Sequence, residues 1–307
     1  MLSCDAYLTP KTLPEALTAW QSAPDGSRLV AGATDLLPWA REGRAGDVHV
    51  PELIDLSRLE ELDGYTVDSG RVRLGANIVY QAFLEDEQLT TRLPCMPYCS
   101  VWFADDQIRR QATLAGNIVN ASPAADGTPP MLVLNAEIEI ARLSGGQVSK
   151  RMIPVSAFVT GPGTTTLEPG EIVTAIVCDD CADYGGAFEK VGQRRSLVIS
   201  TVCAAALVKT SDDGASFIDV RLALGGIGPV PIRLQEIEDQ LKGQLVSSEL
   251  IEEVSLNTDG LINSRTRRAY RGDVVQGFIR RALDNATSKS LAVPNMVDVQ
   301  EQQVANV

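Results

Sequence analysis

Apolar residues recur with a helical period near the start of the chain and predict its first element, a helix over residues 11–22. The residues at this spacing are Leu13, Ala16, Leu17 and Trp20. The elements expected next are a strand at 28–30, which runs into a turn of sequence AGATD, a helix at 35–42 and a strand at 48–55. Together they predict a small β-α-β unit.

The middle of the chain mixes helical and strand periods. Alternating apolar and polar residues at 71–76 (RVRLGA) predict a strand. A glycine-rich stretch at 112–126 interrupts the pattern and is expected to be a turn. The other expected elements are helices at 78–86, 95–105 and 129–135, and a strand at 136–142 that leads into a hairpin turn at 144–146.

A loop rich in glycine, proline and threonine, residues 161–171, precedes a last part in which strands come first and helices follow. Its run VISTVCAAALV, residues 198–208, is largely apolar, contains small residues and predicts a buried central strand. Strands are expected at 171–178, 186–191, 198–209 and 216–225, and helices at 231–242, 247–256 and 265–284. The polar C-terminal residues, about 20, are expected to form a tail.

Composition narrows the classes of function. With 307 residues, the chain exceeds the size at which one hydrophobic core usually stops growing, so two or three lobes are expected. A net charge of −13 argues against a surface for nucleic acids or for anionic membranes. An apolar run of about 18 residues is absent, and the first residues lack the pattern of a secretion signal. A cytoplasmic protein without a membrane span is therefore expected.

The six cysteines are expected to be free thiols in a reducing compartment. Cys178 and Cys181 form a C-x-x-C pattern, for which a redox or metal-binding role is the alternative. No second such pattern and no nearby histidine accompany them. His49, the only histidine, has no visible catalytic partner and is expected to lie in a strand. The sequence therefore predicts neither a metal site nor a catalytic residue.

Two segments combine small and polar residues in a way that indicates a ligand: LVAGATDLL at 29–37 and ATLAGNIVNASPAAD at 112–126. Small residues let a ligand approach the backbone, and Asn, Thr, Ser and Asp supply hydrogen-bonding groups. Exposed amides before a helix would suit a pyrophosphate in the first segment. The alternatives are a turn capped by Thr34 or Asp35 and, for the second segment, an exposed loop. Two such turns favour one large polar ligand, best a dinucleotide, although neither has the Rossmann or P-loop pattern.

Two basic clusters stand out in this acidic chain. Lys190, Arg194 and Arg195 could neutralise a diphosphate or a reduced flavin, or form a solvated hairpin turn. The run RTRRAYR at 265–271 starts a helix and is expected to be a salt-bridged surface, with a docking surface or an internal ion-pair network as the alternatives.

Several of these segments occur in an order that is specific to one protein family. They are LVAGATDLL, DQIRRQATLAGNI (106–118) followed by VNASPAAD, FVTGPGTTTLEPGEIV (158–173), FEKVGQRRSLVIS, ALGGIGPVPIR and SRTRRAYR. Over nearly its whole length the chain resembles the FAD-binding medium subunit of the molybdenum hydroxylases, which include carbon monoxide, xanthine and nicotinate dehydrogenases. The first two segments are similar to the family patterns A-G-G-T-D-L and P-Q-I-R-N-x-A-T-I-G-G-N-I.

The resemblance implies the fold. It is an α+β protein with an FAD-binding fold of the PCMH/vanillyl-alcohol-oxidase type, made of two α/β lobes, and a C-terminal domain of antiparallel sheet and helices. The divisions expected are lobe 1 at 1–57, lobe 2 at 58–176, the C-terminal domain at 177–287 and the tail at 288–307.

The resemblance also implies the residues that bind FAD. The backbone of 31–35 would bind the pyrophosphate from lobe 1, and Thr113, Gly116 and Asn117 would hold it from lobe 2. Ser122 and Asp126 would contact the ribityl or adenosine part, and Val173 and Lys190 would lie near the flavin or adenine. The expected set is Leu29, Val30, Ala31, Gly32, Ala33, Thr34, Asp35, Leu36, Ala112, Thr113, Gly116, Asn117, Ser122, Asp126, Val173 and Lys190.

Two residues depart from the family patterns. Ala33 stands where A-G-G has its second glycine, and Ala115 where T-I-G-G-N has its first. If either position requires a positive φ, alanine there would cost about 1 kcal/mol or more.

The resemblance finally implies an electron-transfer role. A large partner would hold molybdopterin and oxidise the substrate, and a small partner would carry two [2Fe–2S] clusters. This chain would store electrons on FAD and pass them to an external acceptor, with NAD⁺ as one candidate, in a dimer of heterotrimers. The alternatives are a stand-alone flavin oxidase and a flavin-free structural subunit.

Overall fold

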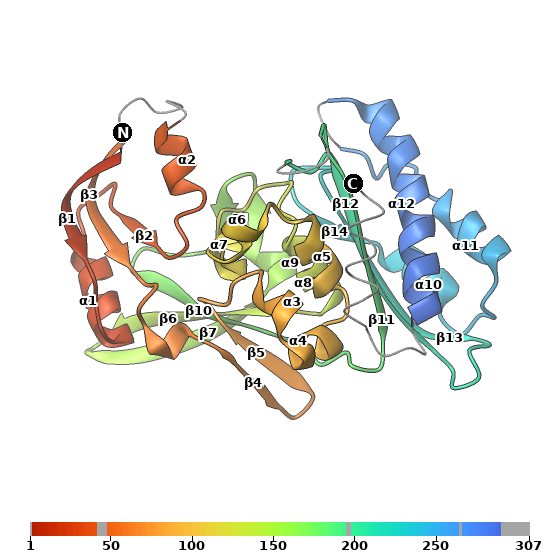
Figure 1. Ribbon diagram of the computed structural model, residues 1–307, viewed down its shortest axis with the longest axis horizontal. Coiled ribbons are helices and arrows are strands. Elements are labelled where there is room, and N and C mark those ends of the chain that lie inside the picture. The colour runs from red at the N-terminus through yellow and green to blue at the C-terminus, as the bar shows by residue number, and fades with distance from the viewer. Residues whose placement is uncertain (1, 42–47, 195–197, 264–265, 290–307) are drawn as a thin grey trace.

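Three β-sheets lie side by side in the computed structural model of the protein, which describes residues 2–41, 48–194, 198–263 and 266–289. Figure 1 shows a small sheet at one end, a larger sheet under short helices in the middle, and a third sheet covered by a long helix at the other end. No helix in the described ranges is long and apolar enough to cross a membrane.

The first sheet has three parallel strands in the order β1-β3-β2. Its strand β1 was not predicted, because its short alternation includes Cys, Asp and Ser, which favour strands only weakly. Helix α1 begins where Thr12 accepts a hydrogen bond from the Glu15 N–H. The elements are β1 (Leu2–Leu8), α1 (Leu13–Ser22), β2 (Arg28–Val30), α2 (Leu36–Arg41) and β3 (Val48–Asp55).

The second sheet has five antiparallel strands in the order β4-β5-β10-β6-β7. The strand expected at 171–178 is its central strand, β10, so it does not lie among the strands of the last part of the chain. Its strands are β4 (Tyr65–Asp68), β5 (Arg71–Gly75), β6 (Glu137–Ser144), β7 (Gln147–Pro154) and β10 (Glu171–Asp179), and a separate pair is formed by β8 (Val159–Gly161) and β9 (Thr164–Thr165).

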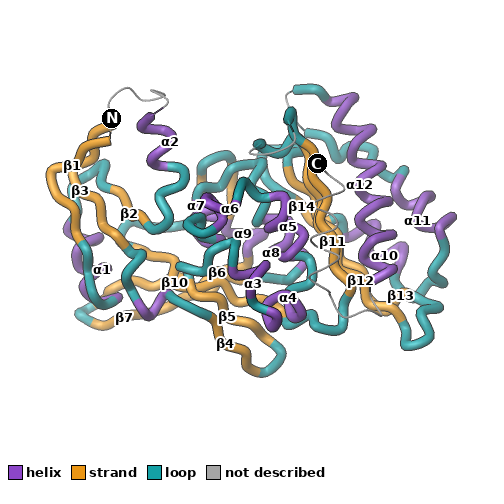
Figure 2. Tube along the Cα trace, in the orientation of Figure 1, coloured by secondary structure: helices purple, strands orange, loops and turns teal. Residues whose placement is uncertain are grey.

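Short helices and loops cover one side of the second sheet (Figure 2). The predicted helix at 78–86 begins only at Ala82, because Val79 pairs with Thr113 in an isolated bridge, and Asp86 ends α3 and caps the next helix, α4. A helix, α7, lies inside the stretch that was predicted to be a turn. The helices are η1 (Glu60–Leu62), α3 (Ala82–Glu85), α4 (Glu87–Arg92), α5 (Met96–Trp102), α6 (Asp106–Arg109), α7 (Leu114–Val119), α8 (Thr128–Val133) and α9 (Val155–Phe158).

The third sheet is antiparallel, with the order β11-β12-β13-β14. As predicted, β12 is a buried central strand. Its alternate residues face two different hydrophobic clusters, one shared with the second sheet and one formed with helices α10 to α12, which explains why it has no polar alternation. The elements are β11 (Gly185–Val191), β12 (Val202–Thr210), β13 (Phe217–Gly225), β14 (Ile232–Arg233), α10 (Gln235–Leu241), α11 (Ser248–Ser255) and α12 (Arg268–Lys289).

Candidate functional site

A row of free backbone amides lies between strand β2 and helix α2. The N–H groups of residues 32–36 donate to no other described residue, and the first bond into the helix runs from the Leu37 N–H to the Ala33 carbonyl at 3.1 Å. Ala33 has a φ of +57°, in the left-handed region. Successive free amides before a helix make a concave site for an anion.

The second glycine-containing segment is built onto a neighbouring loop. Thr113 pairs with Val79 in an isolated bridge, and its hydroxyl accepts from the Gly116 N–H at 3.1 Å, which caps α7. A Cβ at Gly116 would lie 2.7 Å from that hydroxyl oxygen. Glycine at 116 therefore keeps the cap compact and the helix start open.

The two segments touch each other. A Cβ on Gly32 would lie 1.9 Å from the carbonyl oxygen of Gln111, so the backbones meet at a distance that only glycine allows. The Asn120 amide donates to the Asp35 carboxylate at 3.1 Å across the same boundary. The Asp35 side chain still reaches solvent, but the surrounding chain desolvates it in part and raises the pKa of its carboxyl.

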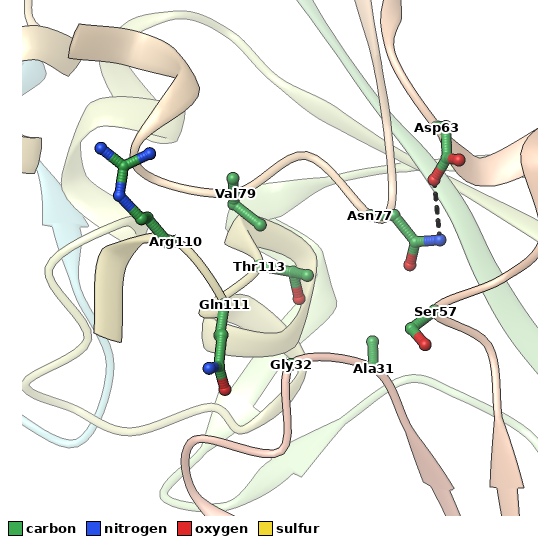
Figure 3. A pocket seen from close by; sticks show the side chains of 9 residues that line it. All are labelled: Ala31, Gly32, Ser57, Asp63, Asn77, Val79, Arg110, Gln111 and Thr113. Carbon is green, nitrogen blue, oxygen red and sulfur yellow. Dashed lines mark hydrogen bonds between the residues drawn. The ribbon is translucent and has the colours of Figure 1, made fainter. Parts of the chain in front are cut away.

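A pocket of about 340 Å³ opens at this boundary (Figure 3). It lies within the volume range of small-molecule sites and is large enough for part of a dinucleotide. Its wall is lined by Ala31, Gly32, Ser57, Asp63, Asn77, Val79, Arg110, Gln111 and Thr113.

Sequence reasoning missed six of these lining residues. Arg110 and Gln111 belong to a recognised motif, so their position between two predicted site segments was a usable signal. Asn77 donates to Asp63 at 3.0 Å, but this contact brings together separate loops and leaves no local pattern. The guanidinium of Arg110 is half-exposed, points away from the other lining side chains (Figure 3), and is paired with Glu85 at 2.9 Å and Asp106 at 3.1 Å.

Family comparisons identify both halves of the chain. Residues 2–178 match the model described as FAD binding domain in molybdopterin dehydrogenase. Residues 187–286 match the CO dehydrogenase flavoprotein C-terminal domain. The chain belongs to the flavoprotein family of the molybdopterin dehydrogenases.

Relatives of this flavoprotein align with it over almost their full length. The putative xanthine dehydrogenase FAD-binding subunit of Escherichia coli K12 is 31% identical, and the alignment covers 94% of this chain and 98% of the relative. The carbon monoxide dehydrogenase medium chain of Afipia carboxidovorans is 25% identical, with 92% and 97% covered. The relatives of this chain therefore include subunits of xanthine and carbon monoxide dehydrogenases, as the resemblance implied.

Solved structures confirm the α+β fold. Reconstituted CO dehydrogenase from Oligotropha carboxidovorans superposes with a TM-score of 0.83 at 24% identity, covering 93% of this chain and 98% of that one. Quinoline 2-oxidoreductase from Pseudomonas putida 86 gives 0.82 at 23% identity, with 93% and 98% covered.

The described residues of the flavoprotein fit FAD. The free amides of 32–36 suit a pyrophosphate, and the pocket beside them lies between the two segments that were predicted to bind the cofactor. Asn117 is fixed through its amide oxygen, which accepts from the Tyr80 hydroxyl at 2.9 Å and the Gly127 N–H at 3.1 Å. Its NH₂ group donates to no described residue and is free for a ligand.

Asp126 and Lys190, which were both predicted to lie near the cofactor, form an ion pair with each other. The Lys190 ammonium is 2.5 Å from one Asp126 oxygen, and the Ser200 hydroxyl donates to the other at 2.5 Å. Both charged side chains are buried. The prediction placed both at the cofactor, and the structure joins them into a buried ion pair between the second and third sheets.

The remaining predicted residues are spread over several environments. Ser122 accepts from the Ala124 N–H at 3.3 Å, and Ala112 is buried. Val173 lies in β10 within the large hydrophobic cluster. The half-buried residues of β2 and of the α2 start are Leu29, Val30 and Leu36.

The other candidate groups lie elsewhere. Arg194 is exposed, and Arg195 falls outside the described residues. Cys178 and Cys181 are free and buried, and burial raises the pKa of the Cys181 thiol to about 12. A thiol with such a pKa is a poor nucleophile at neutral pH. His49 lies in β3, as predicted, on an exposed surface between Ser3 and Asp5.

Proposed function

We propose that this chain is the FAD-binding electron-transfer subunit of a molybdenum-containing hydroxylase or dehydrogenase. The observation that carries the proposal is that the row of free amides at 32–36 and the capped segment at 113–117 meet at one pocket, which Gly32 and Thr113 help to line. The family membership gives that row a cofactor whose pyrophosphate it suits.

In this proposal the chain binds and orients FAD and performs no acid–base chemistry. Bound FAD supplies the ability to exchange either one or two electrons. The backbone of 31–35 holds the pyrophosphate, and Thr113, Gly116 and the free NH₂ group of Asn117 hold it from the opposite side. The expected contacts of Ser122, Asp126, Val173 and Lys190 with FAD remain part of the proposal, with Asp126 and Lys190 also supporting each other.

The rest of the proposal concerns organisation. Residues 1–57 and 58–176 are two FAD-binding lobes, 177–287 are a C-terminal domain and 288–307 a tail. The partners are a large molybdopterin subunit and a small [2Fe–2S] subunit in a dimer of heterotrimers, with NAD⁺ as a candidate acceptor. The support is that several relatives are named as medium chains or FAD subunits of such dehydrogenases.

The absorbance spectrum of the purified chain, followed by acid release of the chromophore, tests the proposal. Flavin bands in the native protein and free FAD in the acid supernatant are the expected result. A colourless chain that takes up no added FAD overturns it in favour of a flavin-free structural subunit. A flavin that acid does not release favours the stand-alone oxidase.

Electron flow is tested separately with the assembled complex. The expected result is that substrate added to the whole complex bleaches the flavin bands, and that NAD⁺ restores them with formation of NADH. Bleaching without NADH formation would retain the electron-transfer role and replace NAD⁺ by another acceptor.

A further inference from the structure

A turn at Trp102–Ala104, directly after helix α5, is held by two cations from different parts of the chain. The Lys190 ammonium, on β11, donates to the Trp102 carbonyl at 3.2 Å. The Arg109 guanidinium, on α6, donates to the Phe103 carbonyl at 3.2 Å and to the Ala104 carbonyl at 3.5 Å. Three consecutive carbonyls are therefore bound by two positive charges.

The turn has a strained backbone. Ala104 has a φ of +48°, which is unfavourable for any residue with a side chain. Such a conformation persists only where the surroundings enforce it. The two cations are the groups that bind the carbonyls on this turn, so they are the means of enforcing it.

The two cations differ in how their charge is compensated. Lys190 has the carboxylate of Asp126 at 2.5 Å. The side chain of Arg109 is 8% exposed, and its nearest carboxylate oxygen, on Asp106, is 3.9 Å away. Its close partners are neutral oxygens, because Nε donates to the Gln81 side chain at 3.2 Å and Nη1 to the two carbonyls. Burial lowers the pKa of Arg109, so its desolvation is only partly offset.

The turn leads to the site through two aromatic rings. The ring of Phe103 is stacked on that of Tyr80, with centroids 3.8 Å apart and an interplanar angle of 4°. Tyr80 is fully buried, and its hydroxyl donates to the amide oxygen of Asn117 at 2.9 Å. The path from Arg109 to Asn117 therefore consists of a bound carbonyl, one ring stack and one hydrogen bond.

We propose that Arg109 is a positioning residue for FAD: it holds the Trp102–Ala104 turn so that Phe103 fixes Tyr80, and Tyr80 fixes the direction in which the Asn117 amide faces the cofactor. The inference rests on the proposed function, because it assumes that FAD binds at Asn117. The side chain of Arg109 does not line the pocket, and no hydrogen bond joins it to Asn117 in the structure.

The test compares FAD affinity and the visible circular dichroism of bound flavin in full-length variants. Arg109→Gln removes the charge and the fork of donors, and we expect FAD to bind about tenfold more weakly, the effect of one charge-assisted hydrogen bond. Arg109→Lys keeps the charge and is expected to recover most of the affinity. Arg221→Gln is the matched control, since the side chain of Arg221 is also largely buried, at 13% exposed, but binds Asp179 and Asp219, away from the turn.

The control separates positioning from a general loss of stability. Arg221→Gln is expected to lower the unfolding temperature and to leave FAD affinity and the dichroism bands unchanged. Arg109→Gln is expected to change both at temperatures where its far-ultraviolet dichroism is that of a folded protein. Tyr80→Phe, which deletes only the hydroxyl, is expected to weaken FAD binding about threefold alone and to add nothing in the Arg109→Gln background.

Two results would overturn the inference while leaving the proposed function intact. One is a folded Arg109→Gln variant with the FAD affinity and flavin dichroism of the unchanged protein. The other is full additivity of the Arg109 and Tyr80 substitutions. If the unchanged protein itself binds no FAD, the proposed function fails before the inference is tested.

Discussion

Replacing Ala33 by glycine is expected to stabilise this protein, against the usual effect of glycine. Ala33 has a φ of +57°, and the left-handed region costs a residue with a Cβ about 1–2 kcal/mol relative to glycine. Glycine in turn raises the entropy of the unfolded chain, at a cost of about 0.4–1 kcal/mol. The net expectation is a gain of about 0.5–1 kcal/mol, or a rise of about 1–3 °C in Tm for a chain of this size.

Ala115→Gly provides the matched substitution with the opposite sign. It also restores a glycine of the family pattern, but Ala115 lies in helix α7 and is 5% exposed. Glycine there costs about 0.5–1 kcal/mol in helix stability and removes a buried methyl group worth about 0.8 kcal/mol. We therefore expect this variant to lose about 1–2 kcal/mol.

Thermal and urea unfolding of the two variants, each without and with FAD, measure the prediction. The strain at Ala33 is present without a ligand, so relieving it should change the folding free energy and leave FAD affinity within about twofold. A decrease in stability for Ala33→Gly, or an increase for Ala115→Gly, would refute the conformational argument. A large gain in FAD affinity for Ala33→Gly would show that the turn changes conformation on binding.

Three further predictions rest on other contacts. Gly32→Ala forces a Cβ onto the Gln111 carbonyl and is expected to lower the free energy of unfolding by about 1–3 kcal/mol and to remove most of the FAD affinity. Gly277→Ala, at an open position of α12, is the control and should raise the free energy of unfolding by about 0.5–1 kcal/mol. Equal effects of the two substitutions in unfolding and FAD titrations would contradict this prediction. Burial raises the pKa of Glu139, but hydrogen bonds from an arginine, a lysine and a threonine outweigh it and hold the value at about 2 against 4.5 unfolded. The ionised Glu139 therefore stabilises the fold by on the order of 2 kcal/mol, after allowance for solvent screening at the half-exposed cations. This stabilisation is complete above pH 4.5 and is lost as the pH falls towards 2, so the difference in unfolding free energy between the unchanged protein and Glu139→Gln should disappear over that range. A difference that does not change with pH would contradict the prediction. Lys190→Met leaves the buried Asp126 carboxylate without its cation and should lower the free energy of unfolding by about 3–5 kcal/mol. The double variant Lys190→Met with Asp126→Leu should recover most of this loss. A double variant less stable than Lys190→Met alone would mean that the ion pair itself is strongly stabilising.

The sequence allowed the local elements of the fold to be predicted more readily than their association. Strands at 28–30 and 48–55 were predicted with their observed bounds, because each is a short segment rich in apolar residues that follows turn residues. The strand predicted at 171–178 is present as β10, but its place in the centre of the second sheet was not predicted. That place depends on pairing with β5 and β6, which lie far away in the chain, and no local pattern reports it.

In the site, too, local segments were predicted more readily than the contacts between distant segments. Motif residues gave the turn at 31–35 and the segment at 113–117, which the structure brings together. Ser57, Asp63 and Asn77 were missed, because ordinary polar residues in loops carry no signal until two loops meet. The mutual pairing of Asp126 and Lys190 was also not foreseen, since a charged residue in a motif can serve a ligand or another residue equally well.

The ion pair between Asp126 and Lys190 has a consequence for the order of events during synthesis. Chains emerge from the ribosome N-terminal end first, at about 5–20 residues per second, so the segments 31–36 and 113–117 are released before Lys190. Until β11 follows, Asp126 lacks its cation and the Trp102–Ala104 turn lacks one of its two holds. We therefore expect FAD to bind only after β11 has been made, and we expect a nascent chain that ends before β11 to bind FAD weakly.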